Sequence, residues 1–92
     1  MGKYLFQGSY TEQGLKGILK EGGSKRREMV EQLIKNLGGT LEVYYFAHGK
    51  DDFVIVVDVP DPVAAIATAL IVNASGAVKM RTTVLILSLI HI

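Results

Sequence analysis

An unbroken apolar run at residues 53–57, Phe-Val-Ile-Val-Val, is the strongest constraint on how this chain can fold. Valine and isoleucine are β-branched, so a run of this kind favours a strand. A strand with one face in water alternates apolar and polar residues, whereas this run places apolar residues on both faces. We therefore expect residues 52–59 to form a central strand that is buried on both sides.

Local signals place the remaining elements around this strand. Alternation and β-branched or aromatic content predict further strands over residues 3–9, 40–47 and 78–86. A short helix capped by Thr11 is expected to end at Gly22-Gly23, and a longer one to run from an N-cap at Ser24 to about Leu37. Asp61-Pro62 is typical of a helix start and predicts a third helix over residues 63–72.

The resulting order, β-α-β-β-α-β, is that of a ferredoxin-like plait of the α+β class. Right-handed crossovers put the helices of both crossovers on one face of a four-stranded antiparallel sheet. The other face is then uncovered, and an exposed apolar sheet face predicts a partner. The simplest partner is a second copy packed face to face about a two-fold axis. We therefore expect a homodimer that encloses a cavity between its two sheets.

Composition argues against several functional classes. Ten basic and nine acidic residues leave a formal net charge of +1, which argues against a nucleic-acid-binding protein. The chain has no cysteine, which excludes disulfides, thiolate metal ligands and cysteine nucleophiles. Its apolar runs are shorter than the roughly 18 residues of a membrane span, and its first residues lack the apolar core of a signal peptide. We expect a cytoplasmic protein with no nucleic-acid or membrane partner.

The end of the chain differs from the rest. Residues 87–92, Leu-Ser-Leu-Ile-His-Ile, equal the in-frame translation of the transposase end sequence used in sequencing-library adapters. Residues 79–83 alternate as a half-covered strand should, whereas residues 84–92 are apolar on both faces. We interpret residues 1–86 as the domain and residues 87–92 as a non-native, adapter-derived tail. An ordinary apolar terminal strand is the alternative.

Several short motifs, in this order, resemble the GYD domain family. They are Ser9-Tyr10-Thr11-Glu12-Gln13-Gly14, Lys25-Arg26, Leu37-Gly38-Gly39 and Gly49-Lys50-Asp51-Asp52-Phe53-Val54. In the last motif Gly49, Asp52 and Phe53 match the family signature, whereas Asp51 stands where an aromatic residue is usual. The resemblance extends to about Ile86 and implies a dimeric α/β-barrel of paired ferredoxin-like sheets. Relatives on that fold include cofactor-free monooxygenases, isomerases and regulatory domains, and the fold does not choose among them.

His48 is the candidate catalytic residue, because histidine titrates near neutral pH. Alternation places it on the face of Glu42 and Tyr44, and Asp51 and Asp52 follow closely. The carboxylates could orient His48 as a general base or join it in a metal site. The alternative is a solvated turn formed by Gly49, Asp51, Asp52 and Phe53. In such a turn glycine permits a positive φ, and aspartate accepts hydrogen bonds from backbone N–H groups. Since no second native histidine supports a metal site, we expect neither a metal nor a cofactor.

Aromatic side chains supply the candidate ligand-binding surface. The predicted lining consists of Tyr4, Phe6, Tyr44, Phe46 and His48. The sequence leaves open which face of the sheet meets the helices, and aromatic residues also build ordinary cores and interfaces. The main hypothesis is a homodimer that binds a small molecule in the cavity between its sheets. The alternatives are a cofactor-free monooxygenase or isomerase with His48 as its base, and a purely structural assembly domain.

Overall fold

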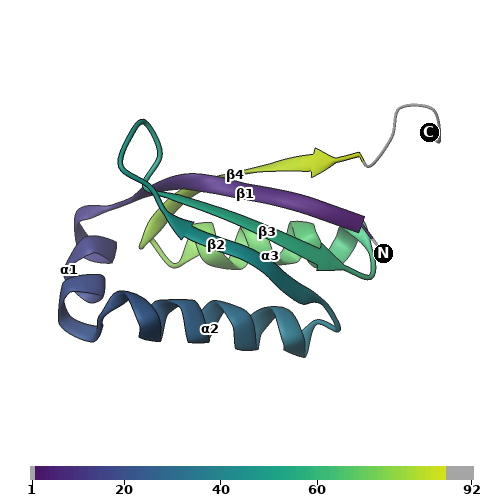
Figure 1. The fold of residues 1–92 in the computed structure, drawn as a ribbon, viewed down its shortest axis with the longest axis horizontal. Coiled ribbons are helices and arrows are strands. Elements are labelled where there is room, and N and C mark those ends of the chain that lie inside the picture. The colour runs from purple at the N-terminus through teal and green to yellow at the C-terminus, as the bar shows by residue number, and fades with distance from the viewer. Residues whose placement is uncertain (1, 87–92) are drawn as a thin grey trace.

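The computed structural model describes residues 2–86 and forms one sheet with all its helices on one side (Figure 1). The elements follow the order β1 (Gly2–Tyr10), α1 (Glu12–Glu21), α2 (Gly23–Asn36), β2 (Thr40–Phe46), β3 (Phe53–Val59), α3 (Pro62–Ala74) and β4 (Val78–Leu85). The four strands pair antiparallel in the order β2-β3-β1-β4. The predicted ferredoxin-like α+β fold is confirmed. The predicted tail, residues 87–92, lies outside the described residues.

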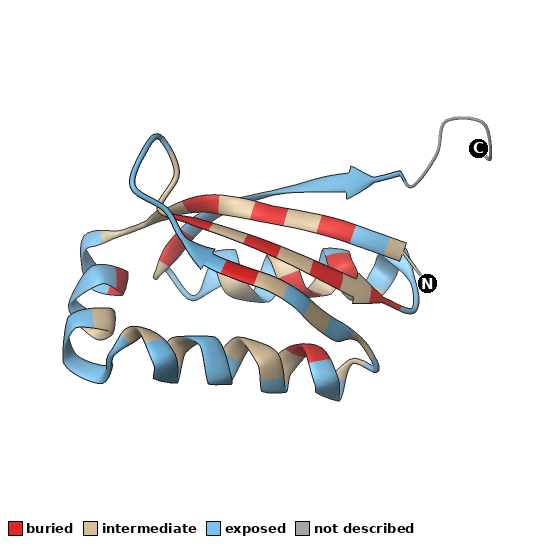
Figure 2. Ribbon diagram, viewed as in Figure 1, coloured by how far each residue is buried: buried red, intermediate tan, exposed pale blue. Residues whose placement is uncertain are grey.

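The inner strands β3 and β1 carry the core. Along β3 every second residue from Phe53 to Val59 is buried against the helices, and the residues between them are half-buried (Figure 2). The predicted central position of β3 is confirmed, because it pairs with β2 on one side and β1 on the other. Its second face is only half-buried within the chain, since no described element covers that side of the sheet.

Two helix starts agree with the sequence, and one differs. The Thr11 hydroxyl accepts a hydrogen bond from the N–H of Gly14 at 3.2 Å, and the Asp61 carboxylate accepts one from Ala64 at 2.8 Å. The predicted N-cap at Ser24 is wrong, because α2 starts at Gly23 with Gly22 as its cap. Gly22 has a φ of +92°, a conformation open to glycine that turns the chain from α1 directly into α2.

A β-bulge in β2 changes which of its side chains share a face. The register between β2 and β3 shifts between Leu41 and Val43. Glu42 therefore lies on the uncovered face, where its carboxylate pairs with the Lys3 ammonium at 2.7 Å, whereas Tyr44 is buried under the helices. The predicted common face of Glu42 and Tyr44 is wrong, because alternation fails across a bulge.

Candidate functional site

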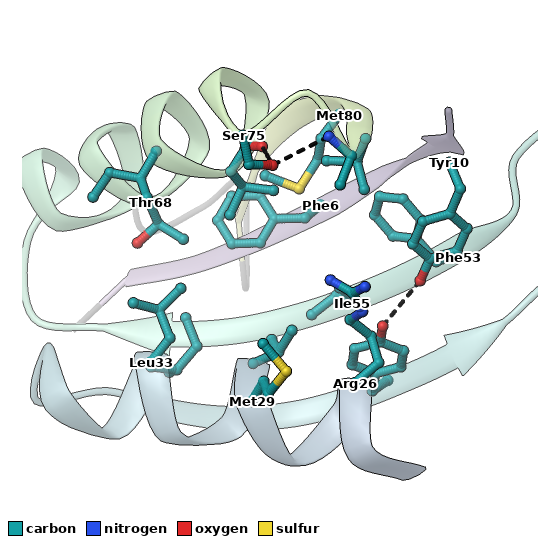
Figure 3. Close-up of a pocket in the computed structure, with 17 residues that line it drawn as sticks. Phe6, Tyr10, Arg26, Met29, Leu33, Phe53, Ile55, Thr68, Ser75 and Met80 are labelled. Atoms are coloured by element: carbon teal, nitrogen blue, oxygen red, sulfur yellow. Dashed lines mark hydrogen bonds between the residues drawn. The ribbon is translucent and has the colours of Figure 1, made fainter. Parts of the chain in front are cut away.

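A cavity of about 320 Å³ lies between the sheet and the helices α2 and α3 (Figure 3). The sheet contributes Phe6, Tyr10, Tyr44, Phe53, Ile55, Val78 and Met80 to its lining, and the loop before β4 contributes Ser75 and Ala77. The helices contribute Arg26, Met29, Val30, Leu33, Ile34, Thr68, Ile71 and Val72. Met29 and Ile71 are more than half exposed, so the cavity reaches solvent between the two helices. Most of this surface is apolar.

Two tyrosines form a polar group at one end of the cavity. The hydroxyls of Tyr10 and Tyr44 are hydrogen-bonded at 3.0 Å. Burial raises the pKa of both phenols above the ordinary value of 10.0, because a phenolate loses hydration energy in this setting. Both hydroxyls therefore stay protonated at neutral pH, and they can donate as well as accept hydrogen bonds.

Arg26 of α2 extends into the same end of the cavity (Figure 3). Its Nε atom is buried and has no hydrogen-bond partner among the described residues. The other polar side chains of the lining differ in this respect: the Thr68 hydroxyl donates to the Ala64 carbonyl at 2.8 Å and the Ser75 hydroxyl to the Val72 carbonyl at 2.6 Å. Arg26 thus brings unused donor capacity to the lining.

The predicted binding residues divide between the cavity and its surroundings. Phe6 and Tyr44 line the cavity. Tyr4 is buried on the same side of the sheet but outside the lining, and Phe46 is half-exposed beside Tyr10, with ring centroids 6.4 Å apart. His48 is exposed in the loop 47–52. The cavity that these aromatic residues approach is therefore the one under the helices, on the side opposite the uncovered face.

Sequence reasoning did not assign Tyr10 and Arg26 to the site, although the sequence contains a signal for each. Tyr10 continues the alternation of Tyr4 and Phe6 along the first strand. Met29 and Leu33 follow Arg26 by three and seven residues, so the three side chains share one face of the helix. A charged residue among apolar residues on one helix face is therefore the signal that could have assigned Arg26 to the site.

The loop 47–52 holds the two carboxylates apart from His48. Asp52 accepts a hydrogen bond from the N–H of Tyr10 at 3.0 Å, and its own N–H donates to the Gly8 carbonyl at 2.7 Å. Asp51 pairs through both oxygens with the Arg81 guanidinium at 2.8 and 3.0 Å. No hydrogen bond joins His48 to either carboxylate in the described part of the chain. The carboxylates fasten this loop to β1 and β4.

Gly49 lies in the same loop without the positive φ that its turn role predicted. Positive φ values occur at Gly22, Gly38 and Gly76 within residues 2–86. A Cβ atom at Gly49 would meet no other atom within 4 Å. The expected conformational reason for a glycine is therefore wrong at this position, and the motif residues that hold the loop are Asp51 and Asp52.

The uncovered face of the sheet has an apolar centre between two ion pairs. By register its apolar residues include Leu5, Val54 and Val56 on the inner strands and Val43 and Tyr45 on the edge strand β2. Tyr45 is 67% exposed. The pair Lys3–Glu42 lies on this face, and the pair Asp51–Arg81 joins the loop to β4.

Two kinds of site are missing from the described residues. None of the helices within residues 2–86 has the length and apolar character needed to cross a membrane. In the same range, histidine and carboxylate side chains nowhere form a group of three that could hold a metal ion.

Comparison with known proteins gives a family and a fold. The crystal structure of MtbAldR superposes with a TM-score of 0.67 over 95% of this chain, at 18% sequence identity, which supports the fold alone. This chain spans about half of that one, 52% of its length. No curated protein matches the sequence. The GYD domain model matches residues 4–88, and the chain therefore belongs to the GYD domain family.

Proposed function

We propose that this GYD domain is a homodimer that binds a small, largely apolar molecule in the cavity between its sheet and its helices. The observation that carries the proposal is the cavity itself. Its volume of about 320 Å³ falls within the range of roughly 300–1,000 Å³ that is typical of small-molecule sites. An apolar wall with a few polar groups gathered at one end is also typical of such sites.

The alternatives have less support. A purely structural assembly domain has no need for a cavity with an orphaned polar group, because such a group costs stability. An enzyme that uses His48 as its base needs the substrate near that side chain, and His48 is exposed in the loop 47–52, outside the cavity lining. The substitution His48→Ala separates the binding hypothesis from the enzyme hypothesis: a binding protein keeps its affinity for the ligand, whereas the enzyme loses its turnover.

The binding proposal is tested with a neutral fluorescent probe, N-phenyl-1-naphthylamine. The test variant is Leu33→Trp, which fills the cavity from α2, and the matched control is Leu19→Trp on α1, where the side chain is 85% exposed. We expect saturable binding to the parent protein, at least about tenfold weaker binding to Leu33→Trp, and unchanged binding to the control. Circular dichroism verifies that both variants are folded. Failure of the probe to bind, or equal binding to both variants, overturns the proposal.

The homodimer proposal depends on the uncovered face. Its apolar centre, with Tyr45 exposed on the edge strand β2, is the kind of surface that a partner sheet covers. A two-fold axis through this centre brings the same residues of both copies together. Sedimentation at tens of micromolar should give a dimer, and Tyr45→Glu should dissociate it, because a carboxylate of each copy would be buried in the interface. Lys25→Glu, on the exposed side of α2, is the control. A monomeric parent protein contradicts the proposal.

A further inference from the structure

We propose that the ligand of this cavity is an apolar monocarboxylate, whose head group is bound by Arg26 together with the hydroxyl pair of Tyr10 and Tyr44. This inference rests on the proposed binding function and specifies its ligand class. Three observations on the same end of the cavity lead to it. Each concerns a hydrogen-bond donor without an acceptor, or a positive charge without a negative partner, among the described residues.

The first observation is the Arg26 side chain. Its Nε–H is buried without a partner in the described structure, and a buried donor on a charged group is among the costlier features to leave unsatisfied. Arg26 takes part in no ion pair of the described residues. A carboxylate suits a guanidinium well, because two N–H groups of the planar fork can match its two oxygens.

The second observation is the tyrosine pair. One hydroxyl donates to the other at 3.0 Å, so the accepting hydroxyl keeps its own hydrogen for a third group. Both phenols stay protonated at neutral pH, as their raised pKa values require. With the Arg26 Nε–H, this end of the cavity offers two donors, an arrangement that selects an acceptor or an anion over a cation.

The third observation is the start of α2. Its first turn contains no acidic residue, and the N-cap Gly22 supplies no side-chain hydrogen bond. The sequence instead places Lys25, Arg26 and Arg27 there. The positive end of the helix dipole disfavours cations at this position. A bound anion at Arg26 would interact favourably with the positive end of the helix dipole and would reduce the mutual repulsion of the basic side chains.

The remainder of the lining fixes the other half of the ligand. Away from the tyrosine pair the walls are formed mainly by aliphatic and aromatic groups, and the hydroxyls of Thr68 and Ser75 are already bonded to backbone carbonyls. A second charged group on the ligand would find no partner there. An unbranched or aromatic chain ending in one carboxylate fits both ends of the cavity.

The test compares decanoate with 1-decanol and decyltrimethylammonium as competitors of N-phenyl-1-naphthylamine at neutral pH. A charged hydrogen bond in a buried site predicts that decanoate displaces the probe at about tenfold or more lower concentration than 1-decanol, with the cation weakest. Arg26→Met should remove this preference and leave 1-decanol within about threefold of its parent value. Arg27→Met, an exposed neighbour on α2, is the matched control and should change neither.

The outcomes separate the two proposals. If the probe does not bind the parent protein, the binding function fails. If the probe binds but decanoate and 1-decanol compete equally, or if Arg26→Met and Arg27→Met behave alike, the head-group assignment is overturned and the binding function stands. Arg26→Lys serves if Arg26→Met fails to fold. It keeps the charge without the Nε donor, so the carboxylate preference should fall several-fold, and an unchanged preference contradicts the role of Nε.

Discussion

Asp52 of the loop 47–52 gives a sharp test of whether the signature carboxylate builds the fold or performs chemistry. Its carboxylate accepts the N–H of Tyr10 at 3.0 Å, at the point where β1 ends. The residue is half-buried, so water replaces this bond only in part. Hydrogen bonds to charged groups contribute about 1.5–3 kcal/mol. We therefore expect Asp52→Ala to lower the free energy of unfolding by about 2 kcal/mol.

The measurement is urea unfolding at neutral pH, followed by far-ultraviolet circular dichroism. Asp52→Asn keeps an acceptor oxygen but loses the charge, which roughly halves the strength of such a bond, so it should recover about half of the loss. Lys50→Ala, an exposed neighbour in the loop, is the control and should stay within about 0.5 kcal/mol of the parent protein.

The same bond connects the loop to the cavity, because the N–H that Asp52 holds belongs to Tyr10. A structural Asp52 therefore predicts that Asp52→Asn retains binding of the fluorescent probe. The reasoning is refuted if Asp52→Ala unfolds within about 0.5 kcal/mol of the parent protein, or if Asp52→Asn is as unstable as Asp52→Ala. Either result would mean that the carboxylate contributes little to the fold.

Two further predictions concern the sheet and its tyrosines. A Cβ at Gly8 would overlap the Lys79 carbonyl oxygen of β4, so Gly8→Ala should separate the two strands and cost about 3 kcal/mol in thermal unfolding; a loss below about 1 kcal/mol would contradict this packing. The pKa values of Tyr10 and Tyr44 are raised above 10.0 by burial, so the folded state keeps protons that the unfolded chain releases. The contribution of these two tyrosines to stability should be constant well below pH 10 and be lost as the pH rises above it. Tyr44→Phe should flatten this decline in urea unfolding, and an unchanged slope would exclude Tyr44 as its source.

The parts of the fold that local chemistry decides could be predicted from the sequence. The apolar run around Ile55 identified a strand, because β-branched residues favour extended backbone, and this strand lies inside the sheet between β2 and β1. The caps Thr11 and Asp61 were predictable, because their side chains bond N–H groups three residues ahead. Gly22 displaced the expected cap at Ser24, since a single glycine with a positive φ was enough to redirect the chain.

The candidate site could be predicted only in part, because it depends on which face of the sheet the helices cover. Alternation grouped Tyr4 with Phe6 correctly but could not state that both face the helices. The bulge in β2 reversed the face of Glu42 through a shift of one residue, which leaves no mark in the apolar pattern. Arg26 is harder still, since an arginine on a helix usually lies in solvent and only its neighbours on the same face reveal otherwise.

The proposed ligand binding uses the face of the sheet under the helices, and the proposed dimerisation uses the uncovered face. The alternation of side chains along each strand keeps these two functions separate. On β1, Phe6 lines the cavity, whereas its neighbour Leu5 lies on the uncovered face. Because successive side chains point to opposite faces, a substitution at Leu5 should act on assembly and one at Phe6 on binding. No side chain of β1 reaches both surfaces. A ligand that changes the dimer's dissociation constant would therefore have to move the backbone of a strand that contributes to both surfaces, as β1, β2 and β3 do.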